Sequence, residues 1–292
     1  MYYTLLMEKK NRPRGVMYAL SPVFIFYAVN LAVSTAFVFI MSRYHGLDLS
    51  TPLSVETAME YSLRYAFELE AAMCLVLTAI LLPGYLRNER REHELIYENR
   101  LAAMDLIKAA VYGIAIFLAV DVLLVMVGGF FDISEYISAN EDAISPVFTG
   151  TVYLDMLLLG LISPASEEIM VRGVLFNRLR GIMDEKDAVM LTAILFGVMH
   201  LGSALQMMYT FLMGYIITKA YSRYENIIVP ILMHSFFNLS NFIIEIPHFA
   251  EFMETKPGLL CYYFLAVALG VFTVKSIWKK EKPPLRGGQN AQ

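Results

Sequence analysis

Long apolar runs recur along the whole chain and constrain its fold more than any other feature. A bilayer core about 30 Å thick is crossed by roughly 20 apolar residues in a helix, and this length criterion marks eight candidate segments. They are residues 16–42, 65–86, 105–128, 150–177, 188–202, 203–222, 227–246 and 258–278. The sequence therefore predicts an all-α polytopic membrane protein with about eight transmembrane helices.

The composition supports this prediction and excludes several other classes of protein. Of the 292 residues, 58% are hydrophobic and 17% are charged, whereas a soluble domain has about 45–50% and 25%. The mean hydropathy is +0.55. A disordered chain is excluded, and the net charge of −4 gives no reason to expect a nucleic-acid partner. The two cysteines, Cys74 and Cys261, lie in apolar runs, which excludes a disulfide scaffold and a multi-cysteine zinc site.

The lysines and arginines are sorted between the two ends of the predicted helices. With eight spans, 19 of the 23 basic residues fall on one side, and three, Arg43, Arg64 and Lys256, fall on the other. Since basic loops stay in the cytoplasm, the sequence predicts that both termini are cytoplasmic, in a cell membrane. The first run is longer than the core of a signal peptide, so we interpret it as a retained helix. We divide the chain into N-terminal spans (1–149), a denser core (150–246), and a last helix with its tail (247–292).

Three polar fragments interrupt the core region, each in a different predicted helix. They read SPASEEIMVR at 163–172, FGVMH at 196–200 and HSFFN at 234–238. An ionisable side chain at membrane depth costs about 2.5–3.5 kcal/mol on insertion scales and indicates function by default. From the expected cytoplasmic helix ends, at 1.5 Å per residue, Glu167, His200 and His234 lie at depths of about 15, 18 and 12 Å. The three helices can therefore bring these side chains to one level in the cytoplasmic half of the membrane.

The spacing within each fragment suggests how the side chains are used. Glu168 and Arg172 are one helical turn apart and can form an ion pair, while Glu167 points about 100° away from Glu168. Pro164 suits the first turn of a helix, so we expect the fourth segment to break near residue 163, with Ser163 as the cap and an exposed helix N-terminus.

These side chains suggest hydrolysis. A carboxylate and an imidazole can hold and deprotonate a water molecule, and a second imidazole with an amide can stabilise an oxyanion. His234 and Asn238, one turn apart, can supply that second pair. The fragments contain no obvious activated serine or cysteine nucleophile. Glutamate and histidine also bind divalent metals such as zinc, which is the alternative use of these groups.

The three fragments resemble the EExxxR, FxxxH and HxxxN/D motifs of the CPBP family of intramembrane proteases. That family includes the type II CAAX prenyl endopeptidases and the bacterial abortive-infection (Abi) proteins, and the resemblance covers residues 150–246. It implies eight helices around a conical, cytoplasm-facing cavity, and an intramembrane glutamate endopeptidase without a metal. The substrate would be a prenylated or other membrane-associated peptide, cut near the cytoplasmic face.

The resemblance also implies a role for each residue of the motifs. Glu167 would be the general base and His200 its partner on the catalytic water. His234 and Asn238 would form the oxyanion hole. Glu168 and Arg172 would support the site.

Two other functions remain as alternatives. The polar cluster can instead join the helices of a non-catalytic protein that binds a partner or acts in immunity or signalling. A proton-coupled transporter would need polar residues along a path to both faces, whereas here they gather at one depth. Asp121 has no evident partner, and Glu70 and Asp155 are expected near the outer surface in contact with solvent. The short link between the fifth and sixth segments allows either two full spans or a re-entrant pair.

Overall fold

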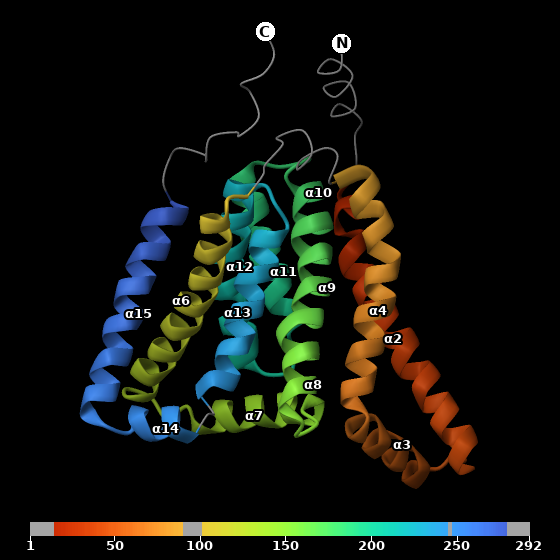
Figure 1. Cartoon of the computed structure of the whole chain (residues 1–292). Coiled ribbons are helices and arrows are strands. Elements are labelled where there is room, and N and C mark those ends of the chain that lie inside the picture. The colour runs from red at the N-terminus through yellow and green to blue at the C-terminus, as the bar shows by residue number, and fades with distance from the viewer. Residues whose placement is uncertain (1–14, 90–100, 245–246, 279–292) are drawn as a thin grey trace, which may run out of the picture.

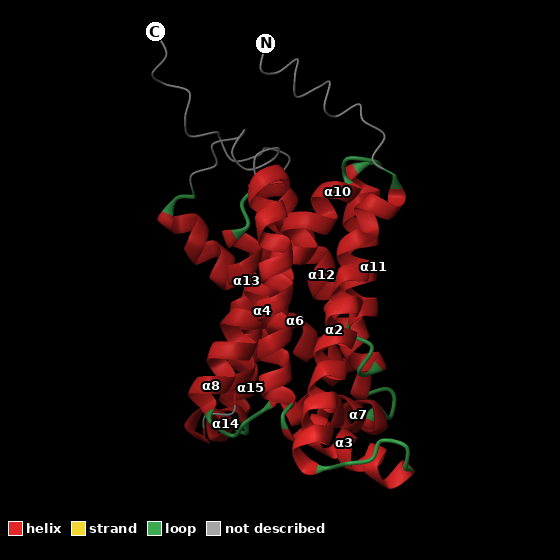
Figure 2. Ribbon diagram, turned by 90° about the vertical axis from the view of Figure 1, so that its right-hand side faces the viewer, coloured by secondary structure: helices red, strands yellow, loops and turns green. Residues whose placement is uncertain are grey.

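The structure is a computed structural model that describes residues 15–89, 101–244 and 247–278. Within these ranges every secondary-structure element is a helix, and loops and turns join the helices, as the apolar runs predict (Figure 2). The elements are α2 (Val16–His45), α3 (Pro52–Arg64), α4 (Ala66–Gly84), η1 (Tyr85–Glu89), α6 (Ala103–Gly128), α7 (Ser134–Ile144), η2 (Ser145–Val147), α8 (Val152–Leu157), η3 (Leu158–Ile162), α9 (Ser163–Glu168), η4 (Ile169–Phe176), α10 (Asn177–Leu179), α11 (Glu185–Met199), α12 (Ala204–Tyr224), α13 (Ile228–Ile244), α14 (Pro247–Met253) and α15 (Lys256–Ile277). The predicted all-α class is confirmed.

The long helices run side by side along one axis, and short helices lie across one end of the bundle (Figure 1). α2 begins and α15 ends at the same end of the bundle, where α10 also lies. α3, α7 and α14 lie at the opposite end. We call these the α10 end and the α7 end. Because the helices alternate in direction, each connection can be assigned to one of the two ends.

Helix length and apolarity support a membrane protein but do not by themselves give eight spans. Among the described residues, four helices are long and apolar enough to cross a membrane: α2, α4 with the start of η1, α6 and α15. A fifth span results if the pair 134–147 and 152–179, bent by 98°, is counted as one. α11, with 15 residues, is only about 22 Å long at 1.5 Å per residue. The count of eight therefore stays a prediction, since the core helices are short or carry the polar residues of interest.

The expected break near Ser163 is absent. Residues 152–179 form one continuous helical rod in which the segments η3 and η4 are π-helical. Ser163 has helical dihedrals, with φ −61° and ψ −50°, and does not cap a helix end. The rod accommodates Pro164 by widening to π-helical turns, which are frequent at functional sites. No helix N-terminus is therefore presented to the paired carboxylates.

Close helix crossings bring the polar fragments together. α6 packs against α13 and α15, α11 packs against α12, and the pair α2–α4 packs against η4 and α9. A Cβ atom on Gly113 of α6 would collide with the backbone carbonyl of Met233 in α13. A Cβ on Gly197 of α11 would lie 2.9 Å from the carbonyl of Met207 in α12. Small residues thus permit the backbone contacts that are typical of helix packing in membranes.

Candidate active site

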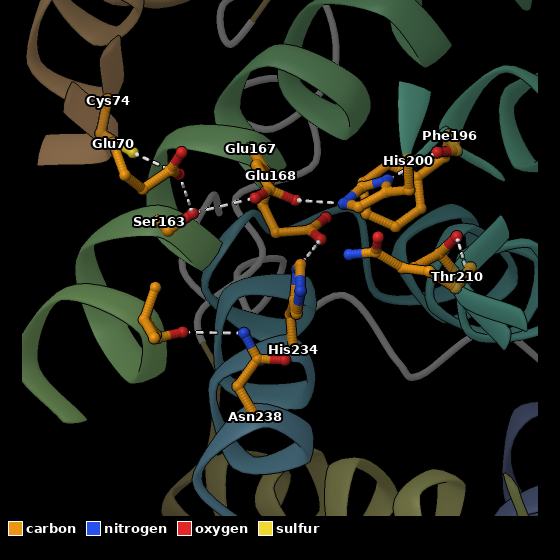
Figure 3. A network of polar contacts seen from close by, with 12 residues as sticks. Glu70, Cys74, Ser163, Glu167, Glu168, Phe196, His200, Thr210, His234 and Asn238 are labelled. Atoms are coloured by element: carbon orange, nitrogen blue, oxygen red, sulfur yellow. Dashed lines mark hydrogen bonds and ion pairs between the residues drawn. The ribbon is translucent and has the colours of Figure 1, made fainter. Parts of the chain in front are cut away.

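Glu167 and His200 face each other across the interior of the bundle (Figure 3). Glu167 Oε2 lies 3.7 Å from His200 Nε2, and the two side chains are 20% and 22% exposed. The other ring nitrogen of His200, Nδ1, lies 2.8 Å from the carbonyl oxygen of Phe196. A carbonyl only accepts, so we assign the proton to Nδ1. In the neutral imidazole, Nε2 is then an acceptor directed at Glu167.

This pair of acceptor atoms suits one water molecule. A separation of 3.7 Å is too long for a direct hydrogen bond, but one water oxygen can lie at about 2.8 Å from both atoms. Glu167 Oε2 is buried and has no hydrogen-bond partner among the described residues. A water that donates one hydrogen to Oε2 and the other to Nε2 keeps its lone pairs free for a third group. That is the orientation a nucleophilic water needs.

Glu168 stands at the centre of a separate, fully buried network. Its Oε1 accepts from Arg172 Nη1 at 2.6 Å and from His234 Nδ1 at 2.8 Å. Both Glu168 and Arg172 have fully buried side chains. Arg172 also donates to Thr218 Oγ1 at 3.2 Å and to the carbonyl of Gly214 at 3.0 Å. The ion pair expected from the i, i+4 spacing is present, and it additionally anchors His234 of α13.

The contacts of His234 restrict how it can act. The Glu168 carboxylate is shared with Arg172 and only accepts, so His234 Nδ1 must be the donor. His234 Nε2 therefore carries a proton only in the imidazolium form. A role as an oxyanion donor thus requires charged His234, opposite the negative Glu168. The sequence did not indicate this condition, since it gives no partner for Nδ1.

Asn238 makes a contact that the sequence did not predict. Its Nδ2 donates to the carbonyl oxygen of Leu159 at 2.7 Å. In the π-helical segment that carbonyl would bond to the N–H five residues later, but residue 164 is proline and has none. Asn238 thus replaces the missing backbone donor. Its second Nδ2 hydrogen remains for a ligand in the cavity, and both Asn238 and His234 line that cavity.

A cavity of about 820 Å³ contains these groups. Its walls come from α2, α4, α6, α9, α11, α12 and α13, and the helix α7 with η2 lines it at the α7 end. Four carboxylates line it, those of Glu70, Asp121, Glu141 and Glu167, together with two imidazoles. The described lining residues include no lysine or arginine. The cavity therefore favours neutral or positively charged ligands over acidic ones.

The cavity extends from the reacting groups toward the α7 end. Exposed lining residues lie there, for example Glu141 and Ser145. The α11–α12 turn also rests on α7, because Ser203 Oγ donates to Asn140 Oδ1 at 3.0 Å. In the other direction, the residues 170–176 are fully buried. The exposed part of the cavity lining thus lies at the α7 end, away from the end where α2 begins. The cytoplasmic position of the cavity and of the termini stays a prediction.

Three acidic residues differ from their expected surroundings. Glu70 Oε1 lies 2.9 Å from Ser163 Oγ inside the cavity, rather than in solvent at the outer surface. Asp155 is only 3% exposed and accepts two hydrogen bonds from Thr149. Asp121, for which the sequence gave no partner, accepts from the hydroxyl of Tyr262 at 2.7 Å. The surroundings of Glu70 and Asp121 result from contacts between helices that are far apart in sequence. Local sequence patterns do not indicate such contacts.

The described residues do not assemble a metal-binding set. No group of three or more His, Cys, Asp or Glu side chains in these ranges is placed to hold a metal ion. Of the candidate ligands, His234 and Glu168 bond to each other and Glu168 pairs with Arg172. This leaves Glu167 and His200 as only two candidate metal ligands among these motif residues. The residues present thus suit water activation by two side chains.

Comparison with known proteins agrees with the resemblance found in the motifs. Residues 149–240 match the family model of the type II CAAX prenyl endopeptidase Rce1-like proteins. This segment, just under a third of the chain, is therefore Rce1-like, and it contains all six residues singled out by the motifs.

A curated relative also matches part of the chain. The UPF0177 protein YxdF of Lactococcus lactis subsp. lactis (strain IL1403) is 33% identical over 82 residues. The match covers 28% of this chain and 45% of that protein, so it spans less than half of the relative's length. No solved structure matches the chain.

Proposed function

We propose that this integral membrane protein is an endopeptidase that hydrolyses a peptide bond with a water molecule held by Glu167 and His200. The observation that carries the proposal is the opposed pair of acceptors, Glu167 Oε2 and His200 Nε2, 3.7 Å apart in a cavity. The match to the type II CAAX prenyl endopeptidase Rce1-like model supports the same reaction class. The substrate would be a prenylated or otherwise lipidated peptide, or another membrane-associated one.

Each group has one part in the proposed reaction. The water attacks the carbonyl carbon of the scissile bond while Glu167 takes one of its protons. The resulting oxyanion accepts from the second Nδ2 hydrogen of Asn238 and from Nε2 of protonated His234. The C–N bond then breaks, and Glu167 returns the proton to the leaving nitrogen. Glu168 and Arg172 hold His234 in place and do not touch the reacting atoms.

The experiment that tests this proposal is cleavage of a quenched fluorescent lipidated peptide by the purified protein in micelles. We expect Glu167→Gln and His200→Asn each to reduce kcat by about 10²- to 10⁴-fold, the usual contribution of general acid–base catalysis. A strong chelator should leave the wild-type rate unchanged. Unfolding of each variant in SDS must match wild type for the loss to be assigned to chemistry.

The other outcomes identify the alternatives. A rate abolished by chelator would move Glu167 and His200 to the role of metal ligands. If Glu167→Gln unfolds the protein and no member of a broad peptide panel is cleaved, the polar cluster joins helices in a non-catalytic membrane protein that binds a partner. That second function has no observation in its favour beyond the burial of Glu168 and Arg172.

A further inference from the structure

Ser163 lies between two carboxylates that come from different helices. Its Oγ is 2.9 Å from Glu167 Oε1, one turn along the same rod, and 2.9 Å from Glu70 Oε1 on α4. Figure 3 shows the three side chains in line, with Glu70 on the far side of Ser163 from Glu167. Neither Ser163 nor Glu70 belongs to the EExxxR, FxxxH or HxxxN/D motifs. This link connects the proposed base to a residue about 100 positions earlier in the chain.

The number of hydrogens in this chain of contacts fixes a protonation state. The Ser163 hydroxyl has one hydrogen and can donate to only one of its two neighbours. The second short contact needs another hydrogen, and only a carboxylic acid can supply it. One of the two glutamates must therefore be neutral. Two carboxylates that share a buried site avoid double ionisation in the same way.

The surroundings place that proton on Glu70. The recorded side-chain contacts of Glu70 are with Ser163 and with the Cys74 thiol, whose Sγ lies 3.4 Å away. Neither contact supplies a positive charge. Glu167, by contrast, interacts electrostatically with the positive charge of Arg172 and adjoins the Glu168–Arg172 pair in sequence. A buried carboxylate without a cationic partner is the costlier of the two to ionise.

We propose that Glu70 is a positioning residue, a neutral acid that donates to Ser163 so that Ser163 donates to Glu167. This proposal rests on the proposed function. Glu167 Oε1 then receives its hydrogen bond from Ser163, and Oε2 is the oxygen that faces His200. The carboxylate is held in one rotamer with its free oxygen on the side of the water. Catalytic groups need this kind of support from residues that do not themselves react.

The protonation state can be tested without any substrate. Infrared difference spectra of the purified protein at neutral pH, wild type minus Glu70→Gln, should show loss of one protonated-carboxyl C=O band. Ser163→Ala should shift this band, because the acid loses its acceptor. Glu141→Gln removes an exposed carboxylate of the cavity lining; it is the matched control and should remove no such band. No loss of the band in Glu70→Gln would overturn the proposal, whether or not the protein is a peptidase.

Kinetics with the lipidated peptide then test the positioning role. The side-chain amide introduced by Glu70→Gln can donate to Ser163 as the acid does, so kcat should stay within about threefold of wild type. Glu70→Leu and Ser163→Ala should each lower kcat by about 10-fold, the effect of losing one hydrogen bond to a charged group, with KM unchanged. The double variant should be no slower than either single one, because both act through one path. Multiplied effects would contradict the proposal.

Discussion

Replacement of Arg172 by methionine tests whether the buried network is an ion pair that the fold depends on. Arg172 and Glu168 are fully buried, and their side chains meet at 2.6 Å. Arg172→Met leaves the Glu168 carboxylate buried with His234 as its remaining donor. Removal of one partner from a buried pair costs about 3–5 kcal/mol. We expect a loss of that size in the free energy of unfolding.

The assay is equilibrium unfolding in mixed SDS micelles, with Arg43→Met as the matched control. Arg43 is an exposed arginine in the last turn of α2, so its loss should change the stability by no more than about 0.5 kcal/mol. The double variant Arg172→Met with Glu168→Gln removes the buried charge and should recover at least half of the loss. A single variant that loses less than about 1 kcal/mol, or a double variant equal to the sum of two singles, would refute the ion-pair reasoning.

Three further predictions follow from packing, backbone bonding and charge. Gly113→Ala pushes α13 off α6 at the Met233 carbonyl and should cost about 1–3 kcal/mol and lower peptidase activity. Gly270→Ala, where a Cβ meets nothing within 4 Å, should be neutral or stabilising in the same SDS titration. Asn238→Leu leaves the buried carbonyl of Leu159 without its donor and should lower the unfolding free energy by about 1–3 kcal/mol, apart from any loss of activity. Because the described cavity lining has carboxylates and no lysine or arginine, a peptide with lysine beside the scissile bond should have a kcat/KM about 10-fold above its glutamate analogue, and equal rates would contradict this electrostatic argument.

Local spacing predicted the parts of the site that depend on one helix. The i, i+4 pair Glu168–Arg172 forms as expected because helical geometry alone places the two side chains together. The agreement in depth between the three polar fragments also corresponds to contacts in the structure, with Glu167 near His200 and Glu168 bonded to His234. Both predictions needed only the geometry of single helices. The catalytic roles of these residues stay predictions.

Features that depend on two helices could not be read from the chain. Glu70 was placed in solvent because it lies near the start of an apolar run, but packing of α4 on α9 turns it toward Ser163. Ser163 and Pro164 form a sequence typical of a helix start, and only the π-helical turns of the rod show how the proline fits inside a helix. Asn238 likewise gained a backbone partner that appears only when α13 meets the rod.

The bond from Asn238 to Leu159 has a consequence for judging which relatives are enzymes. Because Pro164 has no N–H, the carbonyl of Leu159 needs a hydrogen-bond donor from α13. This need does not depend on whether any peptide is cleaved. A descendant that lost its activity would keep this asparagine and its buried Glu168–Arg172 pair to stay folded, and would still display most of the signature. Glu167 and His200 approach each other only to 3.7 Å, without a direct hydrogen bond, so this pair contributes less to folding and is free to change. These two positions are therefore the ones that distinguish a working enzyme from an inactive descendant.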